Sequence, residues 1–106
     1  MNKALFLDRD GVINIDHGYT YKISDFNMLD GVIEGLQAIV LIEYIFFIVT
    51  NQSGIARGLF EVAAFHTFMD YLISILAKNG IQISDYFFCP HHIEGTIPIY
   101  TKKCSC

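Results

Sequence analysis

The sequence predicts an α/β fold with a parallel sheet between helices. Three observations support it: strand-like and helix-like segments alternate along the chain, the strand-like segments are short and apolar, and polar clusters follow the first two of them. Strands that are apolar throughout are typical of parallel sheets, whose two faces are both covered, and alternation with helices indicates crossover connections. A length of 106 residues supports a single small domain, residues 1–106.

The first half of the chain contains one predicted strand and one predicted helix. Ala4 to Leu7 is a short apolar run that ends at a carboxylate. Residues 11–27 are mixed in polarity and predict a long irregular loop. Loops of that length in a compact domain are usually functional. Asp30-Gly31 then opens a helix, whose apolar residues follow helical spacing: Val32, Ile33, Leu36, Ile39 and Val40.

The second half repeats the pattern. Tyr44 to Val49 is rich in β-branched and aromatic residues and predicts the second strand, which ends in the loop composition of residues 50–54. A second helix is expected from about Glu61 to Lys78, and a third strand from Tyr86 to Phe88. No Gly stands between the first helix and the second strand, which weakens the helix stop and predicts exposed apolar surface there.

The composition excludes several classes of protein. The chain is 53% hydrophobic and 17% charged with a net charge of -4, so it is globular, and it is a poor nucleic-acid binder. The apolar stretch 32–49 is interrupted by Glu34, Gln37 and Glu43, which excludes a membrane span. Because no secretory signal is visible, we expect a cytoplasmic protein whose three cysteines stay reduced.

Two carboxylates follow the first predicted strand. Ligands of parallel sheets bind beyond the carboxyl ends of the strands, and residues two apart on an extended chain point the same way, so Asp8 and Asp10 can face one ligand. Such an oxygen pair suits Mg²⁺. A calcium loop is excluded because Val12 stands where a third oxygen ligand is required, but an ordinary solvated turn remains the alternative reading of Asp-x-Asp.

These residues suit phosphoryl transfer. Asp8 would attack phosphorus to give an acyl phosphate, and Mg²⁺ would offset the repulsion between the two anions. Asp10 would protonate the leaving oxygen and then deprotonate the water that cleaves the intermediate. Thr50 and Asn51 follow the second strand and offer a hydroxyl and an amide to phosphate oxygens.

Two segments resemble signatures of the haloacid dehalogenase (HAD) phosphatases. Asp8-Arg9-Asp10-Gly11-Val12-Ile13-Asn14 is similar to the first and Thr50-Asn51-Gln52-Ser53-Gly54 to the second. The resemblance implies a Rossmann-like HAD fold and Mg²⁺ at Asp8 and Asp10. It also implies that Asp8 is the nucleophile, Asp10 the acid/base and Thr50 the phosphate stabiliser.

Asp16-His17-Gly18-Tyr19 and Gly54-Ile55-Ala56-Arg57-Gly58 narrow the resemblance to the heptose bisphosphate phosphatases of lipopolysaccharide synthesis. Histidinol phosphatases are the alternative branch, which lacks the Ala-Arg-Gly. The resemblance implies a monomer that binds a small sugar phosphate, with no nucleic-acid or membrane partner. The substrate would be lined by eight residues: Asp16, His17, Gly18, Tyr19, Thr50, Asn51, Gln52 and Ser53.

The end of the chain predicts a structural zinc site in a loop at about residues 89–106. Cys89-x-His91 and Cys104-x-Cys106 supply three sulfurs and one imidazole, a complete tetrahedral set. Ordinary buried thiols are the alternative, which the polar neighbours of Cys104 and Cys106 disfavour. Composition does not decide between His91 and His92, and the family pattern favours His91.

Two parts that the resemblance implies are not matched in the sequence. These are a Lys or Arg that stabilises the phosphoryl group and an acidic residue that completes the magnesium site; in the family both follow the fourth zinc ligand, whereas Lys102 and Lys103 precede it. We therefore expect a domain that is incomplete at its C-terminus and a chain that is a poor catalyst on its own. A non-catalytic, zinc-stabilised remnant is the third reading.

Overall fold

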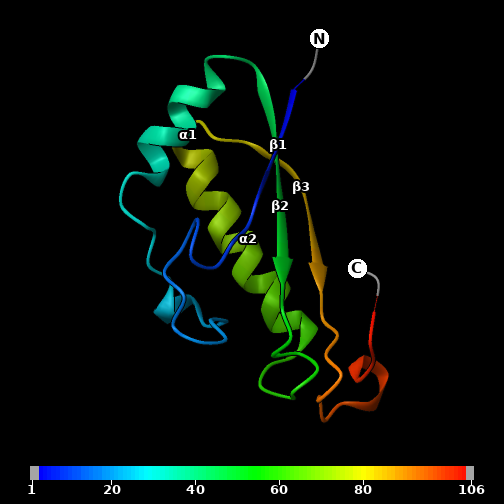
Figure 1. Ribbon diagram of the computed structural model, residues 1–106. Coiled ribbons are helices and arrows are strands. Elements are labelled where there is room, and N and C mark those ends of the chain that lie inside the picture. The colour runs from blue at the N-terminus through cyan, green and yellow to red at the C-terminus, as the bar shows by residue number, and fades with distance from the viewer. Residues whose placement is uncertain (1–2, 105–106) are drawn as a thin grey trace.

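The computed structural model describes residues 3–104 and contains the expected alternation of strands and helices (Figure 1). In chain order the elements are β1 Lys3–Leu7, α1 Val32–Val40, β2 Tyr44–Asn51, α2 Val62–Lys78 and β3 Ile83–Cys89, with 3₁₀ turns at Ile23–Asp25 and Pro98–Tyr100. The predicted α/β fold with parallel strands is confirmed.

The three strands lie in the order β1-β2-β3 and run parallel. β1 pairs with β2 from Lys3↔Tyr44, and β3 pairs with β2 up to Asn51↔Cys89. Both crossovers step in the same direction across the sheet, and crossovers of this kind are right-handed, so α1 and α2 lie on the same face (Figure 1). The carboxyl ends of all three strands therefore meet at one edge of the sheet.

The core lies between this face of the sheet and the two helices. Alternate residues of β2, Phe46 and Ile48, point into it and are almost fully buried. The helices contribute apolar residues at helical spacing: Leu36 from α1, and Phe65, Phe68, Met69, Leu72 and Leu76 from α2. No helix within residues 3–104 is both long enough and apolar enough to cross a membrane.

The opposite face of the sheet carries aromatic and aliphatic side chains that no helix within residues 3–104 covers. Phe6 is 59% exposed, Phe87 50% and Val49 41%. Phe6 stacks on Phe47 across the β1–β2 pair, with ring centroids 5.1 Å apart. The second helical layer of the expected fold is thus not found in the described part of the chain.

All three strands are longer than the sequence predicts, β1 by one residue, Lys3, and the other two by more. β2 continues through Thr50 and Asn51, and β3 begins at Ile83, because each extension is hydrogen-bonded to the neighbouring strand. The local sequence does not show which residues pair in the sheet, and the polar residues of these extensions are typical of loops.

The turn after α1 exposes apolar residues, as the missing glycine between the first helix and the second strand predicts. Glu43 occupies a left-handed backbone conformation (φ 64°), where Gly is the favoured residue. Leu41 is 83% and Ile42 56% exposed in the turn before β2. The turn therefore forms without its usual glycine, at the expense of exposed apolar surface.

Candidate active site and metal cluster

A tight turn follows β1 and carries the two aspartates. The carbonyl of Arg9 accepts the backbone N–H groups of Ile13 at 2.8 Å and of Val12 at 3.2 Å, so the chain reverses within a single turn. Gly11 makes this possible because its φ of 81° is unfavourable for other residues. Asp8 is left at the strand end and Asp10 inside the turn.

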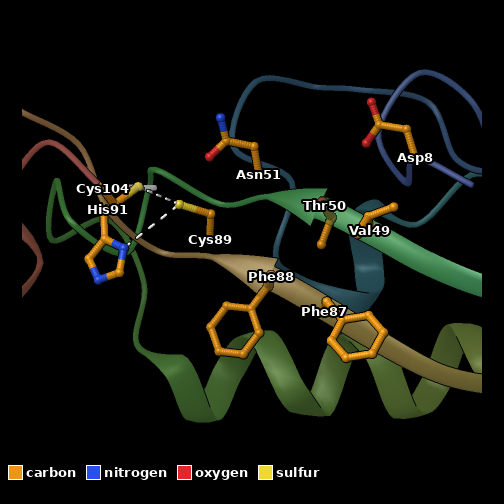
Figure 2. Close-up of a pocket in the computed structure, with 9 residues that line it drawn as sticks. All are labelled: Asp8, Val49, Thr50, Asn51, Phe87, Phe88, Cys89, His91 and Cys104. Atoms are coloured by element: carbon orange, nitrogen blue, oxygen red, sulfur yellow. Dashed lines mark hydrogen bonds between the residues drawn. The ribbon is translucent and has the colours of Figure 1, made fainter. Parts of the chain in front are cut away.

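Asp8 opens onto a cavity of about 690 Å³ at the carboxyl edge of the sheet (Figure 2). Thr50 and Asn51 from the end of β2 line the same cavity, as do Cys89 at the end of β3 and His91 beyond it. The Asp8 carboxylate is exposed, and its Oδ1 accepts the backbone N–H of Arg9 at 2.8 Å. This strand edge thus brings together a carboxylate, a hydroxyl and an amide, the groups expected to surround a phosphate.

Asp10 opens onto a second, smaller cavity of about 250 Å³. Asn51 lines both cavities, and the other residues of the smaller one come from two loops: Asp16, Gly18, Tyr19, Gln52 and Ser53. The expectation that Asp8 and Asp10 face one ligand assumed an extended chain. Because the strand ends at Leu7, the alternation does not continue to Asp10, and the two carboxylates line neighbouring cavities.

Both oxygens of the Asp10 carboxylate accept hydrogen bonds. Arg9 donates from Nε to Oδ1 at 2.9 Å and from Nη2 to Oδ2 at 3.0 Å. Asn14 Nδ2 donates to Oδ1 at 3.0 Å and Gln52 Nε2 to Oδ2 at 3.2 Å. Asp10 is therefore held in one orientation by four donors, and any proton it takes up must displace one of them.

Arg9 is one of three buried residues at this site that sequence reasoning missed. Its side chain is fully buried and lines neither cavity, and its guanidinium lies 4.5 Å from the ring centroid of Phe68. Nη2 also donates to the carbonyl of Thr20 at 2.7 Å, which fixes the loop after β1. Burial lowers the pKa of Arg9, and the charge of Asp10 opposes this shift.

The alternation of side chains along the strand could have identified Arg9. If Asp8 points toward a ligand at the strand end, its direct neighbour points toward the core, where an arginine requires a charged partner. Asn14 and Thr20 were missed as well, and both are buried within the same turn and loop.

The loop at residues 16–19 is shaped by its own polar groups. Asp16 Oδ1 accepts the backbone N–H of Gly18 at 2.9 Å, and Thr20 Oγ1 accepts that of His17 at 2.9 Å. The His17 ring contacts Asn27, with Nε2 2.9 Å from Oδ1, and His17 is not among the residues that line either cavity. The remaining predicted substrate residues line one cavity or both.

Cys89, His91 and Cys104 form a cluster of metal-binding character (Figure 2). Their ligand atoms all lie within 4.8 Å of one another. Cys89 Sγ is 3.7 Å from His91 Nδ1 and 3.1 Å from Cys104 Sγ, whereas a tetrahedral zinc ion separates two sulfurs by about 3.8 Å. A small movement of Cys104 would therefore fit the ion. Cys106, the predicted fourth ligand, lies outside the described residues.

The chain is similar in sequence to two heptose bisphosphate phosphatases over nearly its whole length. The chain is 46% identical over 103 residues to D-glycero-beta-D-manno-heptose-1,7-bisphosphate 7-phosphatase of Photorhabdus laumondii and 45% identical over 106 residues to that of Pasteurella multocida. These alignments cover 97% and 100% of this chain but only 55% and 57% of the relatives. The chain thus spans little more than half the length of these relatives. No protein-family model matches it.

Two solved structures share the fold. A D,D-heptose 1,7-bisphosphate phosphatase from B. bronchiseptica, complexed with magnesium and phosphate, superposes with a TM-score of 0.78 and 33% identity over 87% of this chain and 52% of that one. A HAD-like phosphatase from Mesorhizobium loti gives a TM-score of 0.84 and 32% identity over 92% of this chain and 47% of that one. The described part of the chain therefore has the fold of the corresponding part of the HAD-like phosphatases.

Proposed function

From this homology to the heptose-1,7-bisphosphate 7-phosphatases, we propose that the chain is part of a Mg²⁺-dependent phosphatase. The protein would hydrolyse the 7-phosphate of D-glycero-D-manno-heptose 1,7-bisphosphate, a step toward the heptose of lipopolysaccharide. One observation carries the proposal: Asp8 lies at the carboxyl end of β1, in one cavity with Thr50 and Asn51. In an open α/β sheet this edge is where ligands bind.

Asp8 is the proposed nucleophile. Its exposed carboxylate attacks phosphorus, the phosphate–sugar bond breaks, and an aspartyl phosphate forms on Asp8. Thr50 and Asn51 donate hydrogen bonds to the phosphate oxygens from the neighbouring strand. Asp8 and Asp10 supply the hard oxygen ligands that Mg²⁺ prefers, and the bound ion would offset the repulsion between carboxylate and phosphate.

Asp10 is the proposed acid and base. It gives a proton to the departing sugar oxygen and later takes one from the water that hydrolyses the aspartyl phosphate. The hydrogen bond from Gln52 is the longest of the four that hold the carboxylate, at 3.2 Å. We propose that this bond opens when Asp10 carries the proton, while the Arg9 contacts keep the side chain in place.

The sugar would be bound by the smaller cavity. Asp16, Gly18 and Tyr19 line it from one side, and Asn51, Gln52 and Ser53 from the other. These groups are polar and small apart from Tyr19, which suits a hydroxylated ligand rather than an apolar one.

A structural zinc ion is the second proposed metal. Two sulfurs and an imidazole in one cluster are zinc ligands, and Cys106 would complete the set. The cluster contains His91, whereas the ring of His92 contacts Arg57. We propose that zinc orders the loop after β3 and takes no part in the reaction.

The proposal is tested by phosphate release from the whole phosphatase of which this chain is proposed to be part, with heptose 1,7-bisphosphate and Mg²⁺, because we expect this chain on its own to be a poor catalyst. Asp8→Asn should lower the rate by more than about a thousandfold, because it removes the nucleophile. Asp25→Asn is the matched control, since Asp25 is an exposed aspartate in the same long loop, and it should leave the rate unchanged.

The substrate is tested separately. Histidinol phosphate should be hydrolysed at least about tenfold less efficiently than the heptose bisphosphate. A preference for histidinol phosphate would refute the assigned substrate while leaving Asp8 as nucleophile. Equal rates for the wild type and Asp8→Asn would refute the mechanism itself.

A further inference from the structure

Arg57 lies between the loop of residues 16–19, called the substrate loop below, and the loop of residues 90–104, called the metal loop. It belongs to the loop after β2 and is half-buried. Its guanidinium carbon is 5.9 Å from the ring centroid of Tyr19, a residue of the smaller cavity. On its other side Nη2 is 3.1 Å from Nε2 and 3.5 Å from Nδ1 of His92, next to the metal cluster. Arg57 therefore touches the substrate loop and the metal loop at once.

The contact with His92 is polar. Arg57 Nη2 is closer to Nε2 than to Nδ1, at 3.1 Å against 3.5 Å, and both distances are within hydrogen-bonding range. Nδ1 also accepts the backbone N–H of Glu94 at 2.9 Å, which orients the ring. A planar guanidinium can meet an aromatic face and a polar partner at once, whereas a lysine ammonium acts as a point charge.

The metal loop is also joined to the neighbour of Arg57. The carbonyl of Ala56 accepts the backbone N–H groups of Thr96 at 2.7 Å and Ile97 at 2.9 Å. Gly95 lies so close that a Cβ on it would be 2.7 Å from that carbonyl oxygen. The metal loop is therefore tied directly to the backbone from which Arg57 extends.

Tyr19 is partly exposed and has an unusual backbone conformation. It is 43% exposed, and its backbone has a φ of 54°, which is uncommon for a residue other than Gly. We infer that Arg57 is a positioning residue that transmits the order of the metal loop through His92 to Tyr19, and so sets the shape of the sugar site. Arg57 lines neither cavity that holds an aspartate, so it acts through Tyr19. The metal part of this inference rests on the proposed zinc site.

Hydrogen–deuterium exchange of the purified protein tests the coupling. Zinc added to metal-free protein should slow exchange in residues 89–104, and through Arg57 also in residues 16–20. In Arg57→Ala the first effect should remain and the second should disappear. A cation–aromatic contact of this strength corresponds to about a two- to fivefold change in exchange rate.

Two further variants separate coupling from general loosening. Lys22→Ala removes a cation over Tyr21 in the same loop, 5.7 Å from that ring, and should keep the zinc effect on residues 16–20. Arg57→Lys keeps the charge without the flat face, so it should recover only part of the effect.

The coupling is overturned if zinc protects residues 16–20 equally in the wild type and in Arg57→Ala, or if Lys22→Ala removes the effect as fully as Arg57→Ala does. Failure of the protein to bind zinc would refute the zinc site instead. The coupling would then be judged without metal: Arg57→Ala must speed exchange in residues 16–20 and 92–97 together, and a change confined to one segment refutes it.

Discussion

The two loops that border Asp8 are held in different ways. The loop after β1, residues 8–29, contains four buried residues: Arg9, Ile13, Asn14 and Thr20. The loop after β3, residues 90–104, contains none. Its attachments to the rest of the protein include the hydrogen bonds to Ala56, the contact of His92 with Arg57 and the packing of Tyr100 against the core. The first loop is thus fixed by buried side chains, and we expect the proposed zinc ion to add order to the second.

This difference separates the buried part of the first loop, around Arg9, from its exposed residues 16–19 and from the second loop. A buried, hydrogen-bonded network keeps its geometry whether or not substrate or metal is present. We expect the exposed residues to follow the second loop through Arg57, and the second loop to gain order from the proposed zinc ion.

The largest effect is expected from Arg9→Ala. Asp10 would lose its charged partner and the core would lose a large side chain, so the free energy of unfolding should fall by about 3 kcal/mol or more. Urea denaturation measures it. Arg9→Met, which fills the space between Phe65 and Phe68, should cost clearly less. A loss below about 1 kcal/mol for Arg9→Ala would show that the network does not hold the first loop.

Zinc removal should have the next largest effect and act on the other loop. Metal present at about a hundredfold above its dissociation constant stabilises the folded protein by about 2.7 kcal/mol. A chelator should therefore lower the midpoint of thermal unfolding of the wild type. In Cys104→Ser, which lacks one sulfur of the cluster, the same chelator should have a much smaller effect. An equal response of both proteins would contradict a metal site at this cluster.

Gly95→Ala should loosen the second loop more modestly. The added Cβ would meet the Ala56 carbonyl, and backbone movement to relieve such overpacking costs about 1–3 kcal/mol. Gly35→Ala in α1 is the matched control, since a Cβ there meets no atom within 4 Å and alanine favours the helix. Thermal unfolding of both variants decides the matter: Gly95→Ala must be the less stable of the two.

The smallest effect is expected away from both loops, at Tyr86 on the helical side of the sheet. Burial, with help from Asp70 and Asp85, raises the pKa of Tyr86 above its ordinary value of 10.0. The folded state therefore resists ionisation, so its stability is unchanged below pH 10 and falls as the pH rises beyond it. Unfolding midpoints at pH 9 and pH 11 should differ more for the wild type than for Tyr86→Phe.

The sequence patterns predicted the strands and helices better than they predicted the contacts between loops. Apolar runs placed β1, and the position of Asp8 at a strand end followed from them. The two hydrogen bonds from Arg9 to Asp10 depend on the turn that ends β1. The continuation of β2 into polar residues depends on its pairing with β3. The contact of Arg57 with His92 joins residues 35 positions apart, and no local pattern encodes it.

The sequential strand order has a consequence for how the chain folds during synthesis. Each strand pairs with the next one along the chain, so β1 and β2 can associate with α1 before β3 has been made. Each pairing closes a loop of moderate length, and the entropy lost on closure grows only slowly with that length. Domains form from the N-terminus as the ribosome releases them. The Asp8–Thr50 edge can therefore exist in the nascent protein before the last cysteines are translated.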